Sequence, residues 1–110
     1  MGSKALLFLG GFMLLAGAAS AAEIYGQLWV TPGNSAPVGG VVETSCGGQA
    51  EVDRYGRYRI TGLPKNQTCA LTIQYRNLTS NLANVYTGSH RNGANFMLKF
   101  TGERLLLIRR

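Results

Sequence analysis

The chain has 110 residues, with 11 Lys and Arg against 5 Asp and Glu, and a formal net charge of +6. This length allows one domain with a modest core and is too short for two. The single histidine and the few carboxylates are scattered, without the spacing of a catalytic dyad, a triad or a set of metal ligands. We therefore expect no catalytic residue, no metal ion and no cofactor.

The first 22 residues have the pattern of a cleaved secretory signal. One cation, Lys4, precedes an apolar run at 5–16, and small residues fill positions 18–22. Signal peptidase needs small side chains before its cut, and cleavage after Ala21 or after Ala22 meets this need equally well. The run is shorter than the ~20 residues of a membrane-spanning helix. We therefore expect an exported protein, periplasmic or extracellular, whose mature chain at 23–110 forms one domain without a transmembrane segment.

Alternation of apolar and polar residues dominates the first half of this mature chain and predicts β-strands. Positions 24, 26, 28 and 30 share one face of a first strand, which a loop at 31–40 ends. Val42, Thr44 and Cys46 form the inward side of a second strand. The strands at 49–53 and 57–61 are predicted to pair with each other as a hairpin, in which Gly56 supplies the positive φ of a tight turn.

The C-terminal half continues the alternation. Strands are predicted at 69–75, at 85–87, at 94–100 and at 104–108, with loops at 77–84 and through His90 and Gly93. Short strands with turn signals at close spacing, and no helix between them, are typical of a sandwich. The sequence therefore predicts an all-β fold, a small antiparallel β-sandwich of about seven strands.

The most specific motif lies at 52–75. Asp53 is followed by Gly56, Tyr58 and Ile60, then by Gly62-Leu63-Pro64, and then by an alternating strand. This order resembles the signature of carboxypeptidase regulatory-like domains, which are small sandwiches of the transthyretin (prealbumin) type. The resemblance implies a structural or binding role. The enzymatic branch of that fold, the hydroxyisourate hydrolases, uses several histidines and a C-terminal Y-R-G-S, and this chain has neither.

The chain has two cysteines, Cys46 and Cys69. Cys46 falls on the face of Val42, and Cys69 on the face of Leu71, so both thiols are predicted to point into the core. In an oxidising compartment we expect them to form one internal disulfide. The alternative, a pair of reactive or metal-binding thiols, lacks the C-x-x-C spacing and nearby histidines.

Two groups of apolar residues have no obvious place in one small core. Tyr25, Gln27 and Trp29 share the face of the first strand that points away from the core, where they either contact a partner or are covered by a loop or by the C-terminal segment. The second group is a run of four apolar residues, typical of a strand covered on both faces, either inside a sheet or at a subunit contact. It comprises Leu105, Leu106, Leu107 and Ile108. Together the two groups are the candidate partner-binding surface.

Arginines and tyrosines alternate at 54–59, a pattern that also occurs in nucleic-acid-binding proteins. Alternation sends Tyr58 inward and Arg57 and Arg59 outward, so we expect a solvated strand face and no nucleic-acid partner. Contact with anionic polysaccharide, lipid headgroups or a negatively charged cell surface stays open. His90 follows Ser89, but neighbouring strand residues point to opposite faces, and a solvated loop is favoured over a catalytic pair.

These patterns favour a non-catalytic exported module with a structural or binding role at the cell surface or in the periplasm. The alternative is a self-assembling subunit of an extracellular filament or surface layer, joined through strand edges. For both functions we expect a protein partner or self-association. Asn66-Gln67-Thr68 and Asn77-Leu78-Thr79 match glycosylation acceptors, and the sequence does not decide whether they are used.

Overall fold

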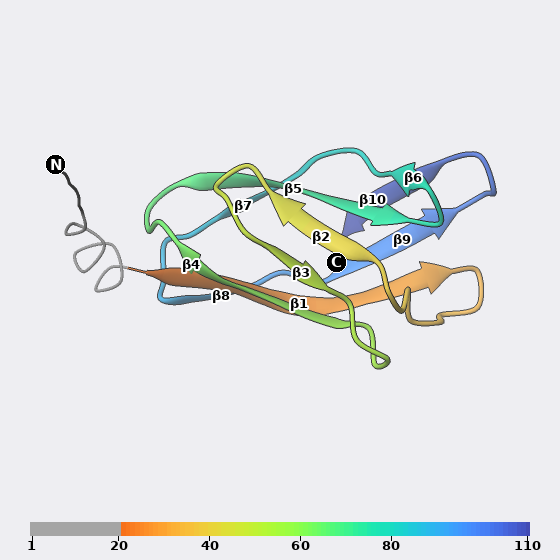
Figure 1. The fold of residues 1–110 in the computed structure, drawn as a ribbon, viewed down its shortest axis with the longest axis horizontal. Helices are drawn as coiled ribbons and strands as arrows, with labels where there is room; N and C mark the ends of the chain where they lie inside the picture. The colour runs from red at the N-terminus through yellow and green to blue at the C-terminus, as the bar shows by residue number, and fades with distance from the viewer. Residues whose placement is uncertain (1–20) are drawn as a thin grey trace, which may run out of the picture.

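The computed structural model describes residues 21–110, which form an all-β fold of two packed five-stranded sheets (Figure 1). The predicted sandwich is confirmed, with ten strands in place of about seven. The predicted signal peptide lies outside the described residues up to residue 20, whereas Ala22 already belongs to the first strand and is buried. Within 21–110, no helix has the length and apolar character needed to cross a membrane.

The first sheet has the strand order β10-β9-β1-β4, and β8 also pairs with β1. Its strands are β1 (Ala22–Thr31), β4 (Arg57–Leu63), β8 (Arg91–Gly93), β9 (Phe96–Phe100) and β10 (Leu105–Arg109). β1 is antiparallel to β4 but parallel to β8 and β9, so this sheet of the predicted antiparallel sandwich is mixed. The reason is the connection: after β4 the chain crosses to the second sheet and returns to the first only at residue 91, so no hairpin joins β8 or β9 to β1.

The second sheet has the order β3-β2-β5-β6, and β7 also pairs with β5. Its strands are β2 (Val41–Thr44), β3 (Gln49–Glu51), β5 (Thr68–Tyr75), β6 (Leu78–Thr79) and β7 (Ala83–Tyr86). In Figure 1, β5 runs along the top of the view and β1 along the bottom. β6, β8 and the start of β7 fall where the sequence predicted loops, because main-chain groups pair there irrespective of the polar side chains.

The predicted hairpin at 49–61 does not form. β3 pairs with β2, and β4 pairs with β1, so the turn at 54–56 carries the chain from one sheet to the other. The chain is committed to the second sheet just before the turn, since the main chain of Val52 bonds to that of Gly39 and Gly40. The turn itself is as predicted, with Gly56 at φ 81°.

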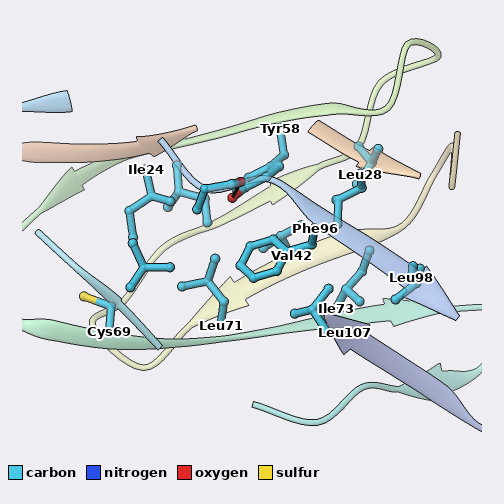
Figure 2. Close-up of a cluster of buried hydrophobic side chains, with 14 of the residues drawn as sticks. Ile24, Leu28, Val42, Tyr58, Cys69, Leu71, Ile73, Phe96, Leu98 and Leu107 are labelled. Atoms are coloured by element: carbon cyan, nitrogen blue, oxygen red, sulfur yellow. Dashed lines mark hydrogen bonds between the residues drawn. The ribbon is translucent and has the colours of Figure 1, made fainter. Parts of the chain in front are cut away.

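The core lies between the two sheets, and Figure 2 shows how their side chains meet. The inward faces predicted from alternation are confirmed for β1, β5 and β9. Fully buried members are Ile24, Leu28, Ile60, Leu63, Leu71, Ile73, Phe96 and Leu98. Tyr58 is buried among them, only 4% exposed, and its hydroxyl donates to the Ala94 carbonyl at 2.6 Å. Burial raises the pKa of the Tyr58 phenol.

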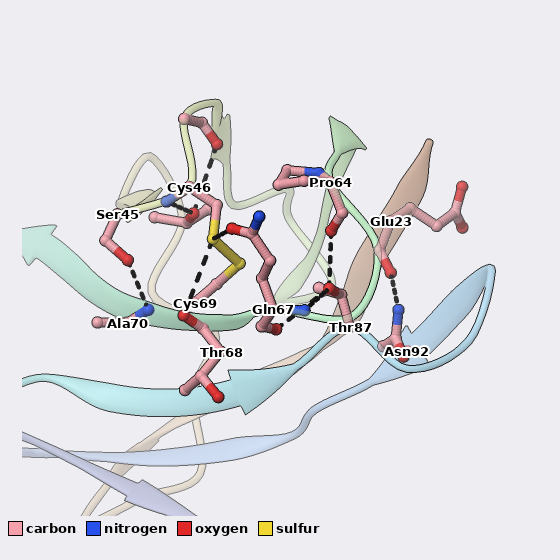
Figure 3. The surroundings of a disulfide bond; sticks show 12 residues. Glu23, Ser45, Cys46, Pro64, Gln67, Thr68, Cys69, Ala70, Thr87 and Asn92 are labelled. Atoms are coloured by element: carbon pink, nitrogen blue, oxygen red, sulfur yellow. Dashed lines mark hydrogen bonds between the residues drawn. A yellow bond between two sulfur atoms is a disulfide. The ribbon is translucent and has the colours of Figure 1, made fainter. Parts of the chain in front are cut away.

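The predicted disulfide between Cys46 and Cys69 is confirmed (Figure 3). Cys69 lies in β5 and is fully buried. Cys46 is not in a strand as predicted, because β2 ends at Thr44, whose hydroxyl oxygen accepts from the Cys46 N–H at 2.8 Å and closes a turn. Ser45 holds this turn against β5 by accepting from the Ala70 N–H at 2.9 Å. The two sulfur-bearing segments are therefore fixed side by side.

At the two ends of the strand order, β10 and β4, the N–H and carbonyl of one residue are hydrogen-bonded to an Asn or an Asp from outside the strand. On β10, the N–H of Leu107 donates to Asn81 Oδ1 at 2.7 Å, and the Leu107 carbonyl accepts from Asn81 Nδ2 at 3.2 Å. On β4, the N–H of Arg57 donates to Asp53 Oδ1 at 2.9 Å, and the Arg57 carbonyl accepts from the Asp53 N–H at 3.0 Å. At these positions the groups that would bind another strand are already satisfied.

Candidate interaction surface

The outer face of the first sheet brings the two predicted surface groups together. Trp29 of β1 pairs with Met97 of β9, and Met97 pairs with Ile108 of β10, so three apolar side chains form one row across three strands. We call Trp29, Met97 and Ile108 the apolar row. Leu106 lies beside it, next to Lys99. Ile108 is 48% exposed and Leu106 36% exposed, so this side of β10 has no cover among the described residues.

Of the two alternatives for residues 105–108, a place inside the sheet is wrong. β10 is the edge strand of its sheet, and only Leu105 and Leu107 point inward, where both are buried. These two residues belong to the core and leave the candidate surface. Leu106 and Ile108 stay in it, because strict alternation holds even in a run of four apolar residues.

Tyr25, Gln27 and Trp29 point away from the core as predicted, but each is engaged by neighbouring groups. The Arg91 guanidinium lies 4.6 Å from the centre of the Tyr25 ring, and that of Arg110 lies 5.0 Å from the Trp29 ring. Gln27 donates from its Nε2 to the Tyr55 carbonyl at 3.0 Å. One face of the Tyr25 ring and one face of the Trp29 ring therefore each make a cation–π contact with an arginine.

Glu23 organises the charges at the other end of this face. Its carboxylate accepts from Arg59 at 2.9 Å and from Arg91 at 2.9 Å, and its own side chain is only 8% exposed. Hydrogen bonds from Arg59 and then from Arg91 lower the pKa of the Glu23 carboxyl. The two arginine side chains remain 66% and 61% exposed, so guanidinium groups fixed by Glu23 still face solvent. No local sequence pattern indicates this cluster, because Arg59 and Arg91 are 36 and 68 residues from Glu23.

This ion-pair cluster predicts a pH dependence of stability. A folded-state pKa below the ordinary value of 4.5 means that Glu23 contributes stability that is fully present above pH 4.5 and is lost as pH falls through the lowered pKa. In Glu23→Gln we expect the free energy of unfolding to fall less steeply as the pH is lowered than it does in wild type, measured by urea titration at several pH values. Glu51→Gln, which removes a carboxylate outside both ion pairs, is the control. Equal slopes in all three proteins would contradict the prediction.

Charge is divided between the two sheets. The strands of the first sheet carry five cations, Arg57, Arg59, Arg91, Lys99 and Arg109. The strands of the second sheet carry no Lys or Arg, and their charged residues are Glu43 and Glu51. Among the strand residues, the positive charge therefore lies in the first sheet.

An open groove of about 710 Å³ adjoins these cations. Its lining includes Tyr25 and the cations Arg57, Arg59 and Arg91, and also the acidic residues Glu51 of β3 and Asp53. The Arg57 guanidinium lies over the Tyr55 ring at 5.3 Å and takes part in no ion pair of the described residues. The groove thus offers guanidinium groups that can accept an anion.

The titratable groups elsewhere do not converge. Within 21–110, no cluster of three or more His, Cys, Asp or Glu residues could hold a metal ion. His90 lies with Nδ1 3.0 Å from the Ala21 carbonyl oxygen, and the Ser89 N–H donates to Asn92 Oδ1 at 3.0 Å. The hydrogen bonds of the described residues do not join Ser89 to His90, and the absence of catalysis stays a prediction.

Comparison with known proteins gives no assignment: no protein-family model matches the chain, and no curated protein is significantly similar to it.

Proposed function

We propose that this protein is a non-catalytic exported β-sandwich module that acts by contact, through the outer face of its first sheet, with a partner in the periplasm or at the cell surface. The observation that carries the proposal is the apolar row beside exposed Leu106, in which Ile108 is exposed and Trp29 and Met97 are half-buried. A sheet face left to solvent is normally polar, and a contiguous apolar patch on a small protein is typical of an interaction site.

Two further observations support the export and the class of this module. A disulfide is typical of proteins that fold in an oxidising compartment. Asp53 closes its turn by accepting from two N–H groups, Gly56 has the positive φ that its turn needs, and Tyr58 fills the core, so these residues have structural roles. Such roles fit membership of the carboxypeptidase regulatory-like domains, which we propose on the motif at 52–75.

Assembly through strand edges is the less favoured mode of contact. On β10, the Asn81 side chain is bonded to the N–H and the carbonyl of Leu107. On β4, the Asp53 side chain accepts from the N–H of Arg57. A second copy would have to displace these groups before it could add a strand to β10 or β4 of the first sheet. The outer face needs no such rearrangement.

The test is retention of the full chain in the envelope of bacterial cells that export it. After osmotic shock, we expect wild-type protein to stay with the envelope fraction and Ile108→Glu to be released, because a buried carboxylate opposes apolar contact. Light scattering of the purified proteins reports self-association through the same face.

The matched control is Tyr86→Glu, which places the same charge at an exposed aromatic residue, 58% accessible, on the outer side of the second sheet. It should behave as wild type. Circular dichroism verifies that both variants fold. Identical retention and identical size of Ile108→Glu and wild type would refute the proposal.

A further inference from the structure

We infer that the partner of the outer face is an anionic lipid membrane surface, to which the sandwich binds with the first sheet facing the headgroups. This inference rests on the proposed function and names its partner class. It follows from two properties that this face combines, an excess of fixed arginines and the half-exposed apolar row.

The charge distribution gives the orientation. All strand cations lie in the first sheet, and Glu23 is the one carboxylate on the strands of its outer face. An anionic surface therefore attracts this side more than the second sheet, whose strands carry Glu43 and Glu51 and no Lys or Arg. Such attraction acts over about one Debye length, roughly 8 to 10 Å at ordinary ionic strength.

The local chemistry fits lipid phosphates. Guanidinium groups bind phosphate through paired N–H donors, and Glu23 orients two of them while leaving each mostly exposed. Arg57 adds a third in the same groove. Beside them, Trp29 and Ile108 provide what a soluble anion would not need: an indole and an aliphatic side chain, the residue types that enter the headgroup boundary.

Two other partners fit less well. Stacking of sugar rings needs free aromatic faces, whereas Arg91 and Arg110 lie over the Tyr25 and Trp29 rings. A symmetric dimer through this face would bring the arginines of one copy against those of the other. Neither difficulty applies to a membrane, because these guanidinium groups bind the lipid phosphates.

The experiment uses Trp29, the single tryptophan of the chain, as its probe. The mature protein is mixed with vesicles of phosphatidylcholine alone or with phosphatidylglycerol, and binding is measured by co-sedimentation and by tryptophan emission. We expect binding and a blue shift only with the anionic vesicles, both reversed by about 0.5 M NaCl. The double variant Arg57→Gln with Arg110→Gln should bind about 25-fold more weakly, because each basic residue near such a surface contributes about fivefold.

The control double variant, Lys65→Gln with Arg76→Gln, loses the same net charge from the β4–β5 connection and the β5–β6 turn and should bind like wild type. Ile108→Ser should reduce binding and the blue shift without changing net charge. Equal loss in both double variants, or binding without a Trp29 shift, would overturn the inference. Binding to dextran sulfate but not to vesicles would overturn the inference in favour of an acidic polysaccharide and leave the proposed function intact. The proposed function itself would be refuted if the Ile108→Glu variant were retained in the envelope as well as wild type.

Discussion

Replacing Tyr58 by alanine is expected to lower the free energy of unfolding by about 3–5 kcal/mol, because a large aromatic side chain leaves a cavity in a small core. Tyr58 is 4% exposed and packs between β1 and the second sheet (Figure 2). Its hydroxyl also satisfies the Ala94 carbonyl, which lies on the connection from β8 to β9. Urea unfolding followed by Trp29 fluorescence measures the change.

The control for this prediction is Tyr58→Phe, which keeps the ring and removes the hydrogen bond. Leaving the buried Ala94 carbonyl without its donor should cost about 1–3 kcal/mol. Any loss of partner binding in Tyr58→Ala should follow the loss of folded protein. If Tyr58→Ala folds normally but no longer binds, Tyr58 belongs to the interaction site and its assignment to the core role alone is wrong.

The sequence predicts strand faces well because alternation is a local property. The side chains of Leu28, Val30 and Phe96 point inward as alternation requires, and Arg57 and Arg59 point outward. The same logic places Leu106 and Ile108 outside once the position of β10 at the sheet edge is known. That position depends on contacts from elsewhere in the chain, so the sequence alone could not separate a covered strand from an edge strand.

Strand partners and the ion-pair cluster were not predictable for the same reason. The turn at Gly56 fixes a reversal of the chain, but pairing of Val52 with Gly39 and Gly40 decides which sheet each flank joins. Glu23 lies on the face of Tyr25 by alternation, yet nothing local indicates that Arg91 reaches it across a parallel pairing. Likewise, the apolar row exists only because β9 aligns Met97 between two strands distant in sequence.

Loss of the Cys46–Cys69 cross-link is expected to lower the free energy of unfolding by about 2–5 kcal/mol. The bond joins segments 23 residues apart, and cutting it frees the unfolded chain to sample more conformations. Cys46→Ser should show this loss in urea unfolding, and alkylation of wild type without reductant should modify no thiol, as measured by mass.

Two controls separate the cross-link from packing. Reduced wild-type protein loses the bond but keeps both sulfur atoms, whereas the double variant Cys46→Ala with Cys69→Ala also loses their volume. Because Cys69 is fully buried and Cys46 half-buried, the double variant should be less stable than reduced wild type by a smaller, packing-related amount. If reduction leaves the free energy of unfolding unchanged while the double variant loses several kcal/mol, the stabilisation comes from packing of the sulfur atoms and the cross-link itself contributes nothing.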